Sequence, residues 1–259
     1  MTVLSPLRMG RLAHVNPVAK LAAVLVTSVA LILTIDWVSA AVALALECIL
    51  LAFTGLPLRA VLTRTLPLLI AAPLAGFTTV LYGQASGETY WQWWAVEVST
   101  GSIALGIATT LRILAVGVPA IVLFITIDPT DLADGLAQIV RLPARFVLGA
   151  LAALRLVGLF VEDWRSLELA RRARGIADRG RLRRLVGQAF ALLVLSIRRG
   201  SKLATAMEAR AFDAPVARTW ARPSVFGARD WVVIAVGILV AASAVVVSVA
   251  AGSWNFVLG

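Results

Sequence analysis

The sequence has little charge for its length. Only 15% of its 259 residues are Asp, Glu, Lys or Arg, whereas soluble domains average about 25%. Apolar residues make up 60% of the chain, and its mean hydropathy is +0.92. This balance excludes an ordinary soluble protein and predicts an integral membrane protein with several spans.

Cysteine and histidine are almost absent. The single cysteine, Cys48, lies in an apolar run, and His14 is the only histidine. A disulfide framework or a cysteine metal site needs more than one cysteine, and one histidine cannot form a metal cluster by itself. We therefore expect no cofactor and no metal site in this chain.

Motifs of several enzyme classes are also missing. The chain has no G-x-x-x-x-G-K-[ST] loop, and Gly200-Ser201-Lys202 lacks the glycine spacing upstream. It has no H-E-x-x-H, G-x-S-x-G or C-x-x-C sequence. A catalytic pair of carboxylates is not apparent either, because the neighbouring acids Glu162 and Asp163 point in different directions on a helix. We expect the chain to be no enzyme and to bind no ATP through a phosphate loop.

Five apolar runs predict five transmembrane helices. They cover Leu21–Ile35, Val38–Phe53, Leu66–Tyr82, Ser102–Ile127 and Trp231–Ala250. Asn16-Pro17 predicts the start of the first helix, because Asn caps helices and Pro suits the first turn. Asp36-Trp37 predicts a tight turn between the first two spans. The expected fold class is an all-α integral membrane protein.

Two segments between these spans are predicted to be loops. Arg59 and Arg64 indicate a short basic loop before the third span, which Pro67 and Pro73 are expected to kink. Residues 83–101 form a longer predicted loop, rich in tryptophan and free of Lys and Arg.

Lysine and arginine are confined to alternate connections between the spans. The segments rich in them are residues 8–20, 59–64 and 141–229. The segments without them are residues 36–37, 83–101 and 251–259. The positive-inside rule places the first set in the cytoplasm, so the N-terminus faces inward and the C-terminus outward. Aromatic belts form at membrane interfaces, and the tryptophans expected at the outer one are Trp37, Trp91, Trp93, Trp94 and Trp254.

The region between the fourth and fifth spans follows a different pattern. Asp128-Pro129 predicts the start of a short helix, and two long amphipathic helices follow over Ala144–Arg174 and Leu182–Arg210. Charges interrupt the apolar stretch of the first, and that of the second is shorter than the ~20 residues of a span. We expect both to lie in the cytoplasm or at the membrane interface. The chain then divides into N-terminal spans, a coupling-helix region and a last span, which cover residues 1–127, 128–229 and 230–259.

The basic charge is concentrated in this region. Residues 141–229 hold 18 of the 24 Lys and Arg and 6 of the 14 acids, which gives the segment a net charge of +12. Such a segment could bind nucleic acid, but no nucleic-acid-binding motif accompanies it. Attraction to the cytoplasm and to anionic lipid headgroups is the commoner cause in a membrane protein, so we expect the lipid bilayer and no nucleic acid as a partner.

The two long helices end in a similar way. The first ends in Ala173-Arg174-Gly175 and the second in Ala209-Arg210-Ala211. An arginine at a helix end can reach out as a bidentate fork. The alternative is a solvated helix end whose cation suits the helix dipole. Because the feature occurs twice, we interpret these six residues as a docking surface for another protein.

Glu47 and Arg112 are ionisable residues within predicted spans. Charge inside a membrane is costly and by default suggests function. The structural alternative is that the two neutralise each other within the bundle, and their similar depths predict an intramembrane pair.

The order of these features resembles a known family, the T components of energy-coupling factor (ECF) transporters, including the cobalt-transporter CbiQ type. The resemblance covers residues 14–220 and is sharpest at the two Ala-Arg triplets, where Ala211 stands in place of the more usual Gly or Ser. It is also carried by His14-Val15-Asn16-Pro17-Val18-Ala19-Lys20-Leu21, Gly55-Leu56-Pro57-Leu58-Arg59 and Asp128-Pro129-Thr130-Asp131-Leu132.

The resemblance implies a membrane subunit that couples two cytoplasmic ABC ATPases to a separate substrate-binding membrane subunit, the S component. Arg174 and Arg210 would each dock into one ATPase. The cargo would be a vitamin or a transition-metal ion, which the sequence does not identify because the substrate pocket would lie in another chain. The location would be the bacterial cell membrane.

Two other classes remain open at this point. A self-sufficient secondary transporter or channel would use Glu47 and Arg112 as its polar path, although no internal repeat is apparent. A membrane-bound enzyme acting on a phosphorylated lipid would need a catalytic cluster, and none is found in the sequence.

Overall fold

A computed structural model describes residues 14–34, 36–83, 86–93, 96–175, 180–212 and 219–253. Arg8 and Arg11 in the predicted basic N-terminal segment lie outside these residues, as do Trp94 and Trp254 of the predicted aromatic belt.

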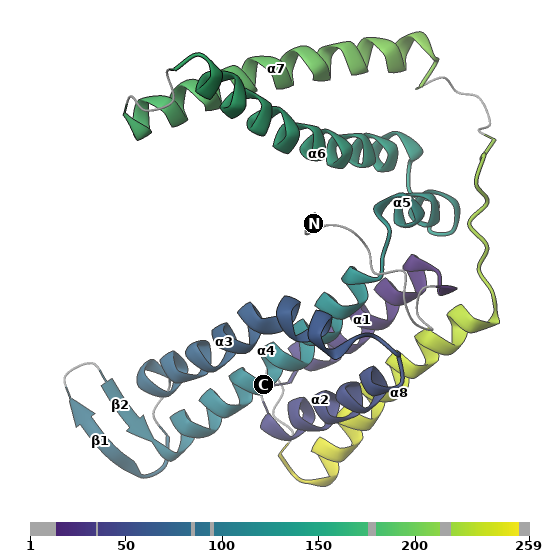
Figure 1. The fold of residues 1–259 in the computed structure, drawn as a ribbon. Helices are drawn as coiled ribbons and strands as arrows, with labels where there is room; N and C mark the ends of the chain where they lie inside the picture. Colours follow the sequence, from purple (N-terminus) through teal and green to yellow (C-terminus); the bar gives the residue numbers. More distant parts are fainter. Residues whose placement is uncertain are drawn as a thin grey trace. The chain divides into compact units, whose positions relative to one another are not determined.

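The described residues form eight helices and one antiparallel hairpin of two strands (Figure 1). The first four helices are α1 (Pro17–Ile32), α2 (Trp37–Ala52), α3 (Leu58–Tyr82) and α4 (Thr100–Ile125). The others are α5 (Pro129–Gln138), α6 (Ala144–Ala173), α7 (Arg181–Ala209) and α8 (Ala228–Ala250). The hairpin strands are β1 (Thr89–Trp93) and β2 (Val96–Ser99). The all-α class is confirmed.

Four of the described helices are long and apolar enough to cross a membrane, namely α3, α4, α6 and α8, and α1 and α2 are shorter apolar helices. Five of these six correspond to the five predicted spans. The sixth is α6, which we predicted to lie at the interface, and its depth in the membrane stays a prediction.

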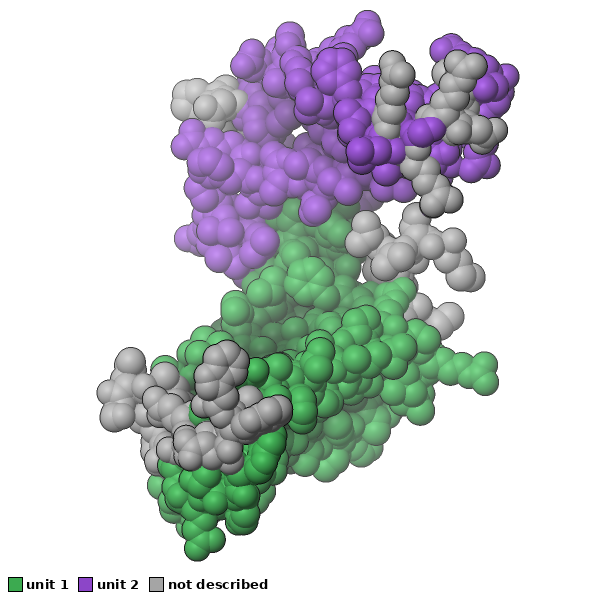
Figure 2. All heavy atoms as spheres, turned by 90° about the vertical axis from the view of Figure 1, so that its left-hand side faces the viewer, with its two compact units in different colours: residues 1–135, 224–259 green, residues 136–223 purple. Residues whose placement is uncertain are grey.

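The chain divides into two compact units (Figure 2). Unit 1 comprises residues 1–135 and 224–259, and unit 2 comprises residues 136–223. The division predicted from the sequence, at residues 127 and 229, rests on location in the membrane or the cytoplasm and not on compactness. It stays a prediction.

Small residues line the helix contacts of unit 1. Ala40, Ala43, Ala72 and Ala115 are fully buried, whereas large side chains such as Phe77 are exposed. This is the pattern of membrane helices, where small residues let backbones approach and large apolar residues face lipid.

The contact between α3 and α4 is the closest example. A Cβ atom at Gly76 would lie 1.8 Å from Oγ1 of Thr110 and 2.6 Å from the backbone oxygen of Gly106. A Cβ at Gly106 would meet the Gly76 oxygen at 2.7 Å. Only glycine at both positions allows this approach.

At one end of unit 1, Asp36 joins α1, α2 and α8. Its carboxylate caps α2 by accepting hydrogen bonds from the backbone N–H of Ser39 at 2.7 Å and from the Ser39 hydroxyl at 2.6 Å. It also accepts one from the hydroxyl of Ser248, near the end of α8, at 2.6 Å. Thr34 shares a hydrogen bond of 3.0 Å with Ser39. The turn predicted at Asp36 is therefore also a tie between three helices.

At the opposite end, Asn16 joins the start of α1 to the segment before α8. The Asn16 side chain accepts a hydrogen bond from the Val18 N–H at 3.0 Å, which confirms the predicted N-cap. Its backbone N–H donates to Asp230 at 2.6 Å, and its amide nitrogen donates to Ser224 and to the oxygen of Val225.

Lys20 lies next to this joint. Its side chain is 1% exposed, and Nζ donates to both the backbone oxygen and Oγ1 of Thr126 at 3.2 Å. Buried charge is tolerated only with such partners, so this lysine ties α1 to the end of α4.

Two predicted loops are wrong. Helix α3 begins at Leu58 directly after Pro57, so Arg59 and Arg64 belong to its first turns. The residues after Pro57 are helix formers, and the basic charges there do not prevent a helix. The predicted kinks at the α3 prolines stay a prediction.

The second wrong loop is residues 83–101. The β-branched and aromatic residues there favour strands, and β1 pairs with β2 through Trp91 opposite Val98 and Trp93 opposite Val96. Helix α4 then starts in a capping box between Ser99 and Ser102.

The predicted helix start at Asp128 is confirmed. Its carboxylate accepts a hydrogen bond of 2.8 Å from the N–H of Thr130, and Pro129 is the first residue of α5. The chain leaves and re-enters unit 1 at neighbouring points, because a Cβ at Gly135 would lie 3.2 Å from the Asn16 side chain and 3.5 Å from Oγ of Ser224.

Candidate functional site

Helices α6 and α7 of unit 2 pack against each other and run in opposite directions (Figure 1). Both leave large apolar side chains exposed, including Leu154 and Leu169 on α6 and Phe190 and Ile197 on α7. An apolar surface of this extent favours contact with lipid or with another protein.

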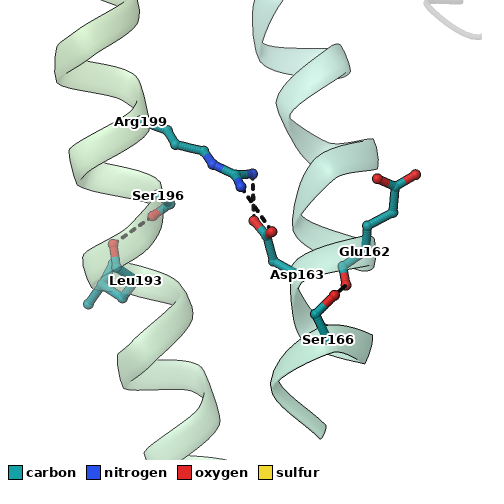
Figure 3. Close-up of polar contacts among 6 residues, drawn as sticks. All are labelled: Glu162, Asp163, Ser166, Leu193, Ser196 and Arg199. Atoms are coloured by element: carbon teal, nitrogen blue, oxygen red, sulfur yellow. Dashed lines mark hydrogen bonds and ion pairs between the residues drawn. The ribbon is translucent and has the colours of Figure 1, made fainter. Parts of the chain in front are cut away.

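An ion pair joins the two helices about two-thirds of the way along each of them (Figure 3). Nη1 of Arg199 lies 2.6 Å from Oδ2 of Asp163, and Nη2 donates to Oδ1 at 3.0 Å. The side chains are 35% and 17% exposed, respectively. Two parallel contacts between a guanidinium and a carboxylate fix the orientation as well as the distance.

A second contact lies closer to the turn between the helices. Nη1 of Arg171 donates to the backbone oxygen of Arg184 at 3.2 Å. A Cβ at Gly187 would lie 3.3 Å from this guanidinium, so glycine leaves room for it. Arg171 therefore helps hold α6 against α7.

The first Ala-Arg triplet forms the end of α6. Ala173 is the last helical residue, and Arg174 is the C-cap, with φ −87° and ψ 4°. Gly175 follows with φ +67°, and its N–H donates to the oxygen of Arg172 at 3.0 Å. Glycine is the usual residue in this left-handed position. The Arg174 side chain is exposed.

The second triplet repeats this backbone path at the end of α7. Ala209 is the last helical residue, and Arg210 is the C-cap, with φ −93° and ψ 17°. Ala211 follows with φ +53°, and its N–H donates to the oxygen of Glu208 at 2.9 Å. The N–H of Phe212 donates to the oxygen of Met207 at 3.1 Å, which completes a Schellman motif. Arg210 is exposed.

The ion pair lies midway between the two triplets along the helices. Arg174 follows Asp163 by eleven residues, and Arg210 follows Arg199 by eleven residues. At 1.5 Å per residue each arginine lies about 16 Å from the ion pair along its own helix. Because the helices run in opposite directions, the two arginines lie on opposite sides of the pair.

Glu47 and Arg112 are not joined in this structure. Within the described residues no ion pair links them, and Oε2 of Glu47 and Nε and Nη2 of Arg112 are buried without a hydrogen-bond partner. Helices α2 and α4 do pack together, but this packing leaves the two side chains unpaired among the described residues. Glu47 instead lines a cleft between α1, α2, α4 and α8.

The family model of CbiQ, cobalt transport protein, matches residues 11–220 of the chain. The chain belongs to the CbiQ family, the T components of ECF transporters. It is similar to the energy-coupling factor transporter transmembrane protein EcfT of Bacillus selenitireducens, with 30% identity over 251 residues, covering 89% of this chain and 90% of the relative.

Other EcfT proteins agree with this assignment. That of Heliobacterium modesticaldum is 28% identical over 233 residues, covering 85% of this chain and 86% of the relative. That of Limosilactobacillus fermentum is 26% identical over 203 residues, covering 74% and 76%, respectively. This T component is therefore a multi-pass membrane subunit of a transporter.

The sequence singles out Arg174 and Arg210 as docking residues, which stays a prediction, but it did not lead us to the ion pair between their helices. In the sequence Asp163 stands out only as a charge within an apolar stretch and as the neighbour of Glu162. The sequence does show a matching spacing, because Asp163 and Arg199 each lie eleven residues before the arginine of their own triplet, but pairing them also requires the register of α6 against α7. The tie through Asn16 and Asp230 joins residues far apart in the chain and has no such local signal.

Proposed function

We propose that this T component couples two cytoplasmic ABC ATPases to a separate substrate-binding membrane subunit for the uptake of a vitamin or a transition-metal ion. The observation that carries the proposal is the repeated helix end. Arg174 and Arg210 cap different helices with the same backbone geometry and lie on opposite sides of the Asp163–Arg199 ion pair.

Each arginine suits one ATPase subunit. A guanidinium at a helix end donates to backbone oxygens or carboxylates of a partner, and its fork fixes direction as well as affinity. Two equivalent arginines on an antiparallel helix pair match two similar partners related by an approximate two-fold axis.

The ion pair gives the helix pair its mechanical role. Closure of the ATPases on nucleotide would move both arginines, and the crosslinked helices would move as one body. Their exposed apolar residues would pass this motion to the substrate-binding subunit, which would tilt and release its cargo.

We further propose that the N-terminus and unit 2 face the cytoplasm and the C-terminus faces outward, in the membrane of a bacterial cell. The ends of α1, α4 and α8 that meet around Asn16 and Lys20 lie on one side, as a five-span path requires. The positive-inside rule assigns this side to the cytoplasm, because the basic residues 141–229 follow it.

The test is purification of the tagged chain after co-expression with the ABC ATPases and membrane subunits encoded beside it. We expect a stoichiometric complex, uptake only when all subunits are present, and no ATP binding by the isolated chain. Uptake by the chain alone would support the rival channel or secondary transporter. Stoichiometric ATP binding by the isolated chain would also contradict the scaffold role.

A further inference from the structure

A cleft of about 400 Å³ lies inside unit 1. It is lined by α1, α2, α4 and α8, and its wall is almost entirely apolar. Its size falls in the range of ~300–1,000 Å³ typical of small-molecule sites.

Glu47 is the ionisable residue in the wall of this cleft. It is only 6% exposed, and Oε2 has no hydrogen-bond partner among the described residues. Thr27, which also lines the cleft, donates its hydroxyl proton to the backbone oxygen of Ala23 in its own helix. A buried acid without a donor is costly, so Oε2 of Glu47 is an acceptor that the described part of the chain leaves unused.

The rim of the cleft carries large apolar side chains that are exposed. Leu50 and Phe53 at the end of α2 are 37% and 68% exposed, and Val232 at the start of α8 is 59% exposed. Large exposed apolar side chains on membrane helices face acyl chains. Lipid can therefore reach the cleft directly.

The size of the cleft discriminates between possible occupants. A helix with side chains is about 10–12 Å wide and rises about 5.4 Å per turn, so 400 Å³ holds only about one turn of a partner helix. An acyl chain is much thinner and is the commonest apolar group in the bilayer core.

We propose that this cleft binds a phospholipid with a primary ammonium headgroup, such as phosphatidylethanolamine. The acyl chain packs against the apolar wall of the cleft, and the headgroup ammonium bends into the cleft to donate a hydrogen bond to Glu47. The reach is short, since Glu47 lies five residues before Ala52, the last residue of α2, or about 8 Å along the axis. A cation is the natural complement of a carboxyl that has no basic partner among the described residues.

This lipid site does not depend on the proposed transport partners. It uses only residues of α1, α2, α4 and α8 and needs no contact with an ATPase. Either proposal can therefore fail while the other holds.

The test is native mass spectrometry of the full-length chain in mild detergent, with phosphatidylethanolamine, its dimethyl derivative and phosphatidylcholine of identical acyl chains. These headgroups lose N–H donors stepwise while keeping their positive charge. We expect binding to fall in that order, with about tenfold between the first and the last, as for the loss of a charge-assisted hydrogen bond. Equal binding of the three lipids by the wild-type chain would overturn the proposal without any variant.

Two cleft variants and one matched control complete the experiment. Glu47→Leu should remove the preference for the ammonium lipid, and Val236→Phe, which fills the cleft, should lower binding of all three lipids. Glu208→Leu changes an exposed glutamate at the end of α7 and should leave the preference intact. A preserved preference in Glu47→Leu would overturn the proposal, and so would equal binding of phosphatidylglycerol, whose headgroup donates only through hydroxyls.

Discussion

The side chains of Asp163 and Arg199 meet across α6 and α7, and each lies eleven residues before the arginine that caps its own helix. The Asp163–Arg199 ion pair therefore lies midway between Arg174 and Arg210 along the two helices. Variants that break this ion pair can therefore test whether α6 and α7 move as one body.

Breaking this ion pair should loosen the helix pair without touching the capping arginines. Asp163→Asn or Arg199→Gln should cost about 1–3 kcal/mol in helix–helix packing, because a partly buried charge loses its partner. The combined change Asp163→Arg with Arg199→Asp should restore much of the lost packing free energy, because the two charges are exchanged and not removed.

The measurement is the distance distribution between spin labels at the exposed residues Leu169 and Ile197, with Cys48 replaced by serine. We expect broadening in the single variants and recovery in the charge-swapped one. Identical distributions in Asp163→Asn and the wild type would show that the pair does not hold the helices together.

Loss of the capping arginines should weaken ATPase docking and leave the fold intact. Arg174→Ala or Arg210→Ala each removes a charge-assisted contact worth ~1.5–3 kcal/mol, which is tenfold or more in affinity. The double variant should be worse than either single one. Lysine should restore binding only in part, because it lacks the planar fork.

Uptake and co-purification of the ATPases measure this effect. Arg165→Ala on α6 and Arg198→Ala on α7 are suitable controls, since both residues are exposed and lie away from the helix ends. Arg171 is a poor control because it bonds to the backbone of Arg184. Normal uptake in the double variant would remove the arginines from the mechanism, and equal damage in the controls would indicate diffuse attraction.

The left-handed residue after each arginine should respond in opposite directions to exchange of Gly and Ala. Ala211 has φ +53° and Gly175 has φ +67°. Ala211→Gly should stabilise the end of α7 by about 1 kcal/mol, and Gly175→Ala should destabilise the end of α6 by a similar amount. Hydrogen exchange of the amides of Ala211 and Gly175 reports both effects. A faster exchange at residue 211 in the glycine variant would contradict the strain argument.

The tie at Asp36 should make the stability of unit 1 depend on pH at the acidic end. Burial alone would raise the pKa of Asp36, but hydrogen bonds from Ser248 and Ser39 outweigh it and lower the pKa below its ordinary value. A carboxyl with a lowered folded-state pKa stabilises the fold fully above its unfolded pKa of about 3.9. That contribution is lost as the pH falls through the lower, folded-state value.

Thermal unfolding in detergent between neutral pH and about pH 3 tests this dependence. Asp36→Asn should lower the melting temperature at neutral pH and flatten its decline toward acid. Ser248→Ala should do so more weakly, because it removes one donor. A wild-type decline that persists unchanged in Asp36→Asn would assign the acid sensitivity to other groups.

The features that the sequence predicted well are local ones. Asn16-Pro17 and Asp128-Pro129 act within a few residues of themselves, so their capping roles could be inferred directly. The hairpin after α3 was not predicted. The lack of Lys and Arg in this segment indicates the side of the membrane, whereas its strands depend on its aromatic and β-branched residues.

Features that depend on how the helices face one another could not be predicted from the sequence. The equal depths of Glu47 and Arg112 suggested a pair, but depth along two helices leaves their rotation about the axis undetermined. The structure turns Glu47 into a cleft, and among the described residues Arg112 forms no ion pair with it. The Asp163–Arg199 contact likewise requires the register of α6 against α7.

The adjacency of Gly135 and Ser224 gives unit 2 the character of an insertion. The chain departs for residues 136–223 and returns at almost the same point, where Asn16 contacts both sides of the gap. A short glycine–serine linker in place of residues 136–223 should thus leave the membrane bundle able to fold. The two connections that lead to residues 136–223 therefore start side by side in unit 1, and Asn16 is the residue that holds them together.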